Sequence, residues 1–326
     1  MKADTSVLWL TIGGREVASS RVRAFYLSDA LRLQGVRSRC VVAAGIRGRI
    51  RAVVALLLLG RAPVIVVQKI LFGALMLRCL RWRASVLVWE CDDALHLGYP
   101  ASPASKVVEE RRRVELVLSS VDVVTTSNPL LATELRPASG RVNVLLGPAP
   151  PPALNPTDRE RVLLWLGSPS TEPYLALLRD VPRRLREAGW ECVALGATAG
   201  ASRFGWRAVR WSRVAQEQWL SRATVGVMPQ PSDPWADRKQ AYKLYEYMAH
   251  GVVPVASDVL PARLAMSDAC LRPFLLDANA DWVRAIVHAA RVREDLVPCF
   301  LQVLDRRSVE SSLTRWREAV ASGAER

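Results

Sequence analysis

The sequence has few of the residues on which several common chemistries depend. It contains three histidines, five lysines among its 45 basic residues, and six cysteines without a CxxC pair. Because zinc-type ligand spacing is absent, no metal site is expected. The motifs GxSxG and GxxxxGK[ST] are also missing, which argues against a hydrolase with a nucleophile elbow and against a P-loop protein.

Long apolar segments are absent as well. The most apolar stretch covers 52–59 and resumes at 62–67, but Arg61 and Pro63 interrupt it, so a transmembrane helix is not expected. The first residues do not have the pattern of a cleaved signal peptide. Together with the scattered cysteines, this indicates a reducing, cytoplasmic location.

The chain is long, rich in apolar residues and positively charged. Its 326 residues are 50% hydrophobic, which suits roughly two domains with cores of their own. The net charge is +14, and most of it is N-terminal: residues 1–150 hold 21 Lys+Arg against 11 Asp+Glu. Either an anionic partner or a general bias toward arginine explains this excess.

Short runs rich in Val, Ile and Leu alternate with helix-like segments along the chain. The predicted strands are 7–11, 40–43, 64–67, 86–89, 121–125, 142–146, 162–166, 192–195, 208–211, 224–228 and 252–256. The predicted helices between them include 21–33, 50–59, 105–118, 172–188, 215–222 and 239–250. This alternation is typical of α/β domains with a parallel sheet covered by helices on both faces.

A proline-rich segment divides the chain. Five prolines occur within 147–156, where neither a helix nor a central strand can continue. We therefore expect an N-terminal domain over 1–147, a linker over 148–160 and a C-terminal domain over 161–326, with the last helix able to pack back on the N-terminal domain. In such doubly wound domains a ligand site is expected at the carboxyl ends of the strands, in the cleft between the domains.

Basic residues flank the most apolar stretch. Arg47, Arg49 and Arg51 precede it, and apolar residues at helical spacing follow it over 71–80 with further arginines nearby. Two interpretations are open for these helices. We favour packing of their apolar faces on the sheet; the alternative is that they lie on an anionic membrane surface.

The segment 229–257 is the most informative. A proline-rich polar loop leads into the predicted helix 239–250, with Asp237 as a plausible N-cap. One face of that helix carries polar residues at spacings of four, three and four: Lys239, Lys243, Glu246 and His250. Lysines at a helix N-terminus attract phosphate, and a carboxylate one turn deeper accepts hydrogen bonds from ribose hydroxyls. The alternative is a set of surface ion pairs.

This segment resembles the donor-binding signature of family-4-type retaining glycosyltransferases. The matching positions are Asp233, Trp235, Lys239, Lys243, Glu246, Tyr247, Met248, Ala249, Gly251, Pro254, Val255, Ala256 and Ser257. The resemblance implies the GT-B fold, with two Rossmann-like domains facing each other across a cleft, and retaining, metal-independent transfer from a nucleotide-diphosphate-sugar donor. Glu246 matches the ribose-binding carboxylate, whereas Arg238 stands where many members have a second Glu. We therefore expect Lys239 and Lys243 to neutralise the negative charge of the leaving diphosphate.

Two glycine-containing loops extend the resemblance. Gly167, Ser168 and Thr171 follow a predicted strand and are similar to the family's first donor-binding loop, although an ordinary strand–helix turn is the alternative. Glu172 replaces the Arg and Lys that usually clasp the diphosphate there.

The second loop, over 12–23, is similar to the family's N-terminal glycine loop. Gly13, Gly14, Arg21 and Arg23 are expected to contact donor phosphate or acceptor. The loop is not GxGxxG, and no acidic residue ends the second strand, which argues against a dinucleotide dehydrogenase.

Polar residues also follow two other predicted strands. Asp92 and Asp93 come after the strand 86–89 and are expected to orient an acceptor hydroxyl, or else to cap a helix. His96 is a candidate general base, although a lone loop histidine is more often simply solvated. Lys69 follows another strand and is a candidate for binding an acidic acceptor.

The sequence therefore predicts a GT-B glycosyltransferase without a cofactor or metal. Its acceptor would be a sugar, lipid-linked glycan or polysaccharide of the cell envelope, with peripheral attachment of the basic N-terminal half to the inner membrane face. One alternative is a catalytically inactive GT-B module that binds a nucleotide or sugar, which Arg238 and Glu172 favour. A basic nucleic-acid-binding protein is more remote, because no recognition motif is present and no specific nucleic acid is expected.

Overall fold

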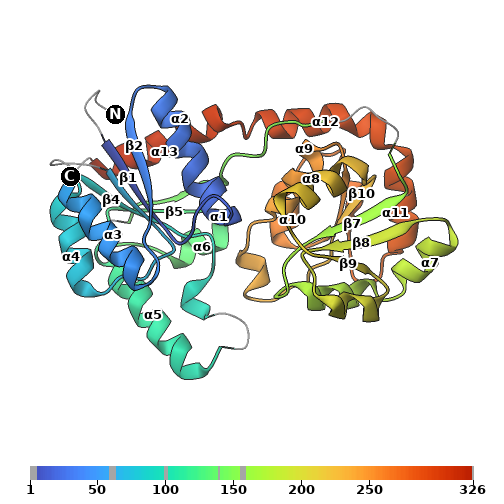
Figure 1. The fold of residues 1–326 in the computed structure, drawn as a ribbon, viewed down its shortest axis with the longest axis horizontal. Helices are drawn as coiled ribbons and strands as arrows, with labels where there is room; N and C mark the ends of the chain where they lie inside the picture. Colours follow the sequence, from blue (N-terminus) through green and yellow to red (C-terminus); the bar gives the residue numbers. More distant parts are fainter. Residues whose placement is uncertain (1–5, 59–63, 99–101, 139, 155–158, 325–326) are drawn as a thin grey trace. The chain divides into compact units, whose positions relative to one another are not determined.

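The structure is a computed structural model that describes residues 6–58, 64–98, 102–138, 140–154 and 159–324 (Figure 1). Contacts divide the chain into two units. Unit 1 comprises Met1–Pro148, Arg238–Gln240 and Arg307–Arg326, and unit 2 comprises Ala149–Asp237 and Ala241–Arg306. Of the proline-rich segment, 155–158 lie outside the described residues, as do Leu59, Arg61 and Pro63 of the apolar stretch.

Unit 1 contains a parallel sheet of six strands in the order β2-β1-β3-β4-β5-β6. The strands are β1 (Ser6–Thr11), β2 (Arg37–Val42), β3 (Val64–Gln68), β4 (Val86–Glu90), β5 (Val123–Thr126) and β6 (Val142–Val144). The Val, Ile and Leu runs of β3 and β4 are buried along their whole length, as the central strands of a parallel sheet require.

Helices cover both faces of this sheet (Figure 1). In unit 1 they are α1 (Ala18–Ser20), the π-helix η1 (Arg21–Phe25), α2 (Tyr26–Leu33), α3 (Gly45–Leu58), α4 (Ala74–Arg83), η2 (Leu95–Leu97), α5 (Ala104–Leu118), α6 (Pro129–Glu134) and α13 (Val309–Ala324). Helices α2 and α13 pack together on one face, and α3, α4 and α5 cover the other. The Trp316 ring of α13 lies 5.0 Å from that of Trp9 in β1, centroid to centroid.

Unit 2 repeats the design with the strand order β12-β11-β10-β7-β8-β9. Its parallel strands are β7 (Val162–Leu166), β8 (Glu191–Leu195), β9 (Arg207–Val209), β10 (Val225–Met228), β11 (Val253–Ser257) and β12 (Leu275–Leu276). The two-residue edge strand β12 is too short to leave a pattern in the sequence and was not among the predicted strands.

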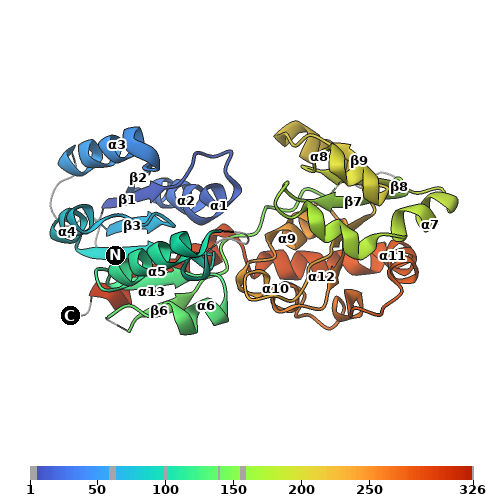
Figure 2. The same cartoon turned by 90° about the horizontal axis from the view of Figure 1, so that it is seen from below.

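The helices of unit 2 also lie on both sides of its sheet (Figure 2). They are η3 (Glu172–Leu178), α7 (Val181–Glu187), η4 (Ala199–Phe204), α8 (Arg213–Arg222), η5 (Ala236–Arg238, whose last residue groups with unit 1), α9 (Tyr242–Ala249), α10 (Leu260–Ala265), η6 (Arg272–Phe274), α11 (Trp282–Arg291) and α12 (Arg293–Asp305). The predicted helix 172–188 is thus two elements. Pro182 explains the break, since its ring would clash with the carbonyl four residues earlier.

We had favoured packing of the apolar residues of α3 on the sheet, but some of them lie on its outer side. Only small residues and one leucine of this helix are buried: Gly48, Ala52, Ala55 and Leu56. Its larger apolar side chains are exposed to solvent. Within the described residues, no helix has the length and apolar character needed to cross a bilayer.

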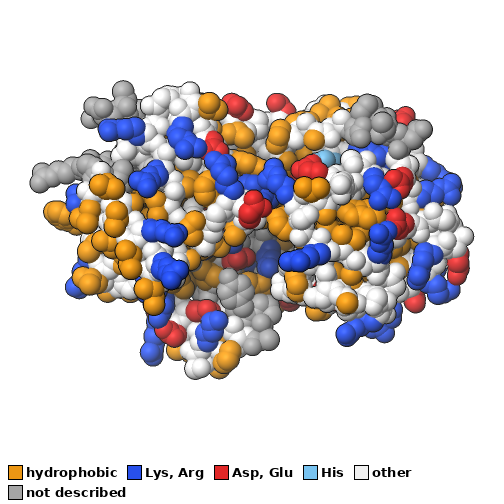
Figure 3. Space-filling model, in the orientation of Figure 1, with side chains coloured by type: hydrophobic (Ala, Val, Ile, Leu, Met, Phe, Trp, Pro, Cys, Tyr) orange, Lys and Arg blue, Asp and Glu red, His pale blue; other side chains and the backbone are white. Residues whose placement is uncertain are grey.

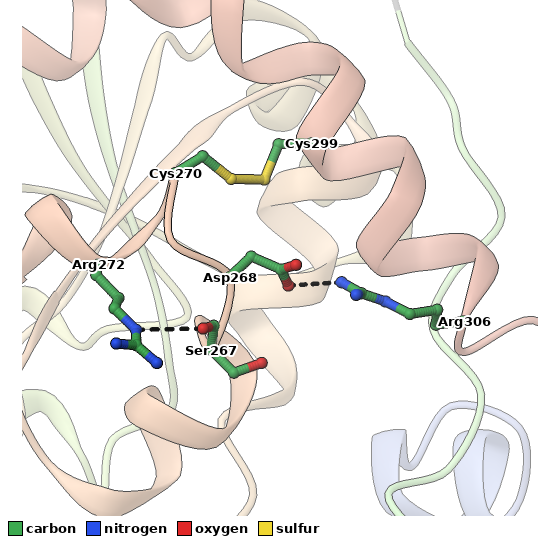
Figure 4. Close-up of a disulfide and its surroundings, with 6 residues drawn as sticks. All are labelled: Ser267, Asp268, Cys270, Arg272, Cys299 and Arg306. Atoms are coloured by element: carbon green, nitrogen blue, oxygen red, sulfur yellow. Dashed lines mark hydrogen bonds and ion pairs between the residues drawn. A yellow bond between two sulfur atoms is a disulfide. The ribbon is translucent and has the colours of Figure 1, made fainter.

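A disulfide joins Cys270 to Cys299 across 29 residues of unit 2 (Figure 4). It links the segment after α10 to α12. Nearby, Arg306 forms an ion pair with Asp268 at 2.5 Å. The scattered cysteine spacing gave no indication of this pair, which is uncommon in a reducing compartment.

We expect replacement of both bonded cysteines, Cys270→Ser with Cys299→Ser, to lower the free energy of unfolding of unit 2 by about 3 kcal/mol. Closing a loop of roughly this length constrains the unfolded chain by that amount. Urea denaturation measures the change, and Cys79→Ser, at an exposed free thiol, is the matched control. A count of six reactive thiols in the unfolded, unreduced chain would contradict the disulfide.

Candidate functional site

Each sheet has one point at which the order of the strands reverses. In unit 1, β2 lies on one side of β1 and the later strands follow on the other side, so the reversal lies between β1 and β3. In unit 2 the reversal lies between β7 and β10. Loops at the carboxyl ends of such strand pairs diverge to opposite faces and leave a crevice, where ligands bind in open α/β sheets. The site residues predicted from the sequence are described below by their position relative to these two reversal points.

The loop after β7 starts with Gly167, and the structure shows why a glycine is needed. A Cβ at this position would lie 2.0 Å from the indole ring of Trp165. The Gly167 amide donates a hydrogen bond to the Leu195 carbonyl of β8 at 3.0 Å. Gly196 is equally constrained, since its φ is +90° and a Cβ would meet the Gly167 carbonyl. Two glycines therefore let the loop pass tightly over the end of the sheet.

The hydroxyls of this loop bond to one another. The Ser168 amide donates to Thr171 Oγ1 at 3.3 Å, and Ser168 and Ser170 share a hydrogen bond of 2.9 Å between their hydroxyls. Thr171 precedes η3 without a side-chain cap, and η3 is a 3-10 helix of seven residues. The loop is exposed and shaped by its own polar groups, with a short helix behind it.

Glu172 connects the first two loops of unit 2. Its carboxylate is buried and accepts hydrogen bonds from the Thr198 amide at 2.6 Å and the Thr198 hydroxyl at 3.0 Å. A negative charge at the position where the resemblance expects Arg or Lys thus has a structural use. It fixes the loop after β8 to the loop after β7.

The helix of the donor-binding signature begins later than predicted. Helix α9 starts at Tyr242, with Ala241 at the N-cap and no side-chain cap. Asp237 is therefore not the N-cap; it lies in η5 and accepts a hydrogen bond from the Ser232 hydroxyl at 2.9 Å. Lys239 lies before the helix, in the segment that groups with unit 1, where its carbonyl accepts from Asn128 at 3.3 Å. Lys239 and Lys243 do not share a helix face.

Lys243 and Glu246 do occupy the first two turns of α9. The Lys243 ammonium lies 5.4 Å from the ring centroid of Trp165, the same ring that packs against Gly167. Glu246 accepts a hydrogen bond from Gln216 of α8 at 3.2 Å, and Gln216 accepts one from the indole of Trp211 at 2.9 Å. The structure thus brings a cation, a carboxylate and a glycine loop together at the end of β7.

His250 follows the last turn of α9. One ring nitrogen lies 2.9 Å from the Glu246 carbonyl and the other lies 3.0 Å from a Glu217 carboxylate oxygen. Its ring binds a carbonyl at the C-terminal end of the helix, where His250 is the C-cap residue. It therefore does not extend the polar face formed by Lys243 and Glu246.

Tyr247 is a key residue to which the sequence analysis gave no role. Its buried hydroxyl accepts a hydrogen bond from the Leu166 amide at 2.9 Å and lies 3.2 Å from the carbonyls of both Leu164 and Val227. It thereby joins β7 to β10 at the reversal point. Gly226 leaves room for its ring, since a Cβ there would lie 2.5 Å from it. Burial raises the pKa of the Tyr247 phenol, which keeps it protonated.

We expect Tyr247→Phe to lower the free energy of unfolding by about 1–3 kcal/mol, since the Leu166 amide would stay buried without a partner. Thermal or urea denaturation measures this loss, and Tyr174→Phe, at a half-buried tyrosine of η3, is the control. Equal stability of the Tyr247→Phe and Tyr174→Phe variants would contradict the role of the hydroxyl.

In unit 1, the glycine loop after β1 is tied to the neighbouring strand. The Gly13 amide donates to the Ser20 hydroxyl at 3.2 Å, which donates to the Gln68 side chain at 2.9 Å. A Cβ on Gly13 would overlap Val17, whereas Gly14 has open space around its Cα. Gln68 ends β3, so this chain of bonds spans the reversal point.

Arg21 and Arg23 are buried rather than displayed on the loop. Arg21 donates to the Arg15 carbonyl at 3.0 Å. Arg23 forms an ion pair with Glu90 of β4, with Nε at 2.6 Å from the carboxylate, and also donates to the Leu145 carbonyl. Within unit 1 the charge of Arg23 is thus used to neutralise a buried carboxylate.

Lys69, Asp92 and Asp93 form a cluster at the carboxyl ends of β3 and β4. The Lys69 ammonium lies 2.5 Å from Asp92 and 2.8 Å from Asp93, and all three side chains are largely buried. Lys69 has a φ of +56°, a left-handed conformation that is uncommon for a residue with a Cβ. Such local strain persists where the surroundings impose it, and it is frequent at functional sites.

His96 lies in η2, three residues after Asp93. Its Nε2 atom is 3.0 Å from Glu134 of α6, whose carboxylate also binds the Arg238 guanidinium. The hydrogen bond from Arg238 lowers the pKa of Glu134. Burial lowers the pKa of His96, so this imidazole is neutral at pH 7. Arg238, which replaces a family Glu, therefore orders a His–carboxylate pair in unit 1.

No protein-family model matches the chain, and no curated protein matches it. Solved structures do. A glycosyltransferase from Rickettsia africae ESF-5 matches with a TM-score of 0.69 at 8% identity, over 99% of both chains. The β-glucosyltransferase of T4 phage matches with a TM-score of 0.57 at 11% identity, over 97% of this chain and 99% of the other.

A pneumococcal O-GlcNAc transferase, GtfA, solved with UDP and GlcNAc, matches with a TM-score of 0.57 at 12% identity. This chain covers 61% of that longer protein, and the match covers 86% of this chain. At such identities the likeness shows the fold. The predicted fold class is confirmed: two α/β units, each with a parallel six-stranded sheet, as in glycosyltransferase structures of the GT-B type.

Proposed function

We propose that the protein is a glycosyltransferase that moves a sugar from a nucleotide-diphosphate-sugar to an acceptor hydroxyl. The observation that carries this proposal is the reversal point of unit 2. There Lys243 and Glu246 lie on the first two turns of α9 beside the Gly167 loop. The shared fold supports it, since several similar structures are glycosyltransferases solved with UDP.

The donor would bind to unit 2 through three kinds of contact. The Glu246 carboxylate accepts hydrogen bonds from ribose hydroxyls. The Lys243 ammonium neutralises the diphosphate, and the main chain of the Gly167 loop approaches it closely. The sequence also predicted Lys239 for this role, but that residue lies outside α9 and groups with unit 1.

The reaction breaks the bond between the anomeric carbon and the diphosphate oxygen, which leaves with the electron pair. Positive charge near the leaving diphosphate stabilises the transition state. We propose that Lys243 supplies it without a metal ion. Retention of anomeric configuration is proposed from the family-4 resemblance of residues 229–257.

The acceptor would bind to unit 1. Lys69, held between Asp92 and Asp93, provides a polar anchor for a sugar or an acidic group. We propose that His96, whose pKa is lowered by burial and whose Nε2 faces Glu134, takes the proton of the acceptor hydroxyl at Nδ1. We propose a sugar, lipid-linked or polysaccharide acceptor of cell-envelope synthesis and a cytoplasmic enzyme.

An inactive binding module is the second candidate. Two positions favour it: Glu172 and Arg238 both carry the opposite charge from that in the family and are used in internal contacts. Release of free nucleoside diphosphate from a donor sugar separates the candidates, since a binding module releases none. A screen of nucleotide-sugars by thermal stabilisation identifies the donor for this assay.

We expect Glu246→Ala to weaken nucleoside-diphosphate binding about ten- to hundredfold, because hydrogen bonds to a charged group contribute about 1.5–3 kcal/mol. Isothermal titration with UDP, GDP and ADP measures the affinity. Glu187→Ala, at an exposed glutamate of α7, is the control with unchanged affinity. Retained affinity in the folded Glu246→Ala variant would place the ribose elsewhere.

We expect Lys243→Ala to lower kcat about a hundredfold or more, as does removal of a single group that stabilises transition-state charge. Lys239→Ala should have a smaller effect because Lys239 lies outside α9. Lys106→Ala, at an exposed lysine of α5, should leave turnover unchanged. Wild-type rates for both Lys239→Ala and Lys243→Ala would exclude lysine stabilisation of the diphosphate.

A further inference from the structure

Helix α3 is apolar on two opposite sides. Its buried side faces the sheet through Ala52, Ala55 and Leu56. The outer side carries larger apolar residues at spacings of four, three and four: Ile46, Ile50, Val53 and Leu57. Ile46 is 80% exposed and Leu57 is 67% exposed. A helix packed only on its own sheet has no use for this outer apolar stripe.

Helix α4 continues the exposed apolar surface. Leu75 and Trp82, two turns apart on one side of the helix, are each 77% exposed. Both views place α4 beside α3 (Figures 1 and 2). Of the seventeen large apolar residues that are exposed in the described parts of the chain, eight lie on these two helices. We call the outer sides of α3 and α4 the α3–α4 face.

Arginines border this face, and acidic residues are missing from it. On α3, Arg49 flanks one edge of the stripe, and Arg47 and Arg51 flank the other. Residues 30–89 contain ten arginines, one lysine and no Asp or Glu. Among the described residues, no carboxylate lies within ion-pair distance of these three arginines or of Arg78 on α4. In Figure 3, apolar and basic side chains lie together over α3 and α4.

This combination narrows the choice of partner. A second copy of the same face would bring arginine against arginine, so self-association through it is disfavoured. An anionic lipid surface satisfies both components at once. Apolar side chains enter the boundary of the acyl chains, while the long arginine side chains reach outward to the phosphates.

We propose that the α3–α4 face docks the protein on an anionic lipid surface. The helices lie flat on the surface, with the Ile46–Leu57 stripe and Trp82 inserted and the flanking arginines paired with lipid phosphates. This inference does not depend on the proposed function: it rests on exposure and charge in unit 1, whereas donor binding was assigned to unit 2.

Co-sedimentation of the full chain with vesicles tests the proposal. We expect binding to equimolar phosphatidylcholine–phosphatidylglycerol vesicles and little binding to phosphatidylcholine alone. Ile50→Ser with Leu57→Ser should weaken binding at least about tenfold, since each loses several buried CH2 groups. Leu33→Ser with Val214→Ser, at exposed apolar residues of α2 and α8, should leave it unchanged.

Charge variants test the second component of the face. Arg47→Gln and Arg49→Gln should each weaken binding about fivefold, the equivalent of about 1 kcal/mol per arginine near an anionic surface. Arg183→Gln with Arg291→Gln, at exposed arginines of unit 2, is the matched control. An equal loss in this control would reduce the effect to net charge alone and overturn the assignment to this face.

A native cysteine offers a direct probe in the unaltered protein. Cys79 is exposed on α4, between Leu75 and Trp82 on the same side of the helix. Burial raises the pKa of Cys40 to about 11 and that of Cys91 and Cys192 to about 12, so a maleimide reacts preferentially at the exposed Cys79. A nitrobenzoxadiazole label there should shift its emission to the blue with anionic vesicles.

Three results would overturn the proposal. The first is unchanged emission of the Cys79 label when the protein is mixed with anionic vesicles. The second is equal binding to neutral and anionic vesicles. The third is a dimer in light scattering that Ile50→Ser with Leu57→Ser converts to a monomer, which would assign the face to self-association.

Discussion

One buried hydroxyl determines how the candidate donor site is built. Tyr247 binds main-chain groups of both β7 and β10, the two strands between which the order of the second sheet reverses. Because the tyrosine points into the sheet, the rotation of α9 about its axis is fixed. Lys243, four residues earlier, must lie on the same side of the helix and meets Trp165 of β7. Glu246 is then turned toward α8, where Gln216 reaches it.

The positive charge of unit 1 is used in two distinct ways. Inside, it neutralises carboxylates at strand ends: Arg23 pairs with Glu90, and Lys69 lies between Asp92 and Asp93. Removing one partner of such a buried pair leaves an uncompensated charge, which is destabilising. These residues therefore contribute to the stability of the fold. Outside, the arginines of α3 pair with no carboxylate in the described structure. Net charge alone does not separate these two groups.

Much of the architecture could be predicted from the sequence, because central parallel strands are continuous Val, Ile and Leu runs. The errors have specific physical causes. The spacing of polar residues predicted that Lys239 lies in a helix, but Arg238–Gln240 group with unit 1 instead, and spacing does not reveal tertiary contacts. Helix α3 has two apolar sides, and a periodic pattern does not tell which one meets the sheet. Cysteines 29 residues apart carry no local signal of pairing.

Within the candidate site, residue types were easier to predict than geometry. The helix pattern identified Lys243 and Glu246, which lie together. It gave no role to Tyr247, whose only local clue was a glycine, Gly226, inside a strand. Arg23 was expected to contact donor phosphate or acceptor because residues 12–23 resemble the family's glycine loop. Its ion pair with Glu90 depends on the sheet order, which brings together residues 67 positions apart.

The discontinuity of unit 1 has a consequence for how the protein is made. The core of this unit includes Leu313, Trp316 and Val320 of α13, the last described helix. A chain emerging from the ribosome presents the six strands of the first sheet long before this helix exists. Until α13 has been synthesised, Trp9 and its neighbours lack the side chains that cover them, so the core of unit 1 stays incomplete. The core residues of unit 2 all lie between Ala149 and Leu304, so unit 2 is able to complete its core before α13 is made.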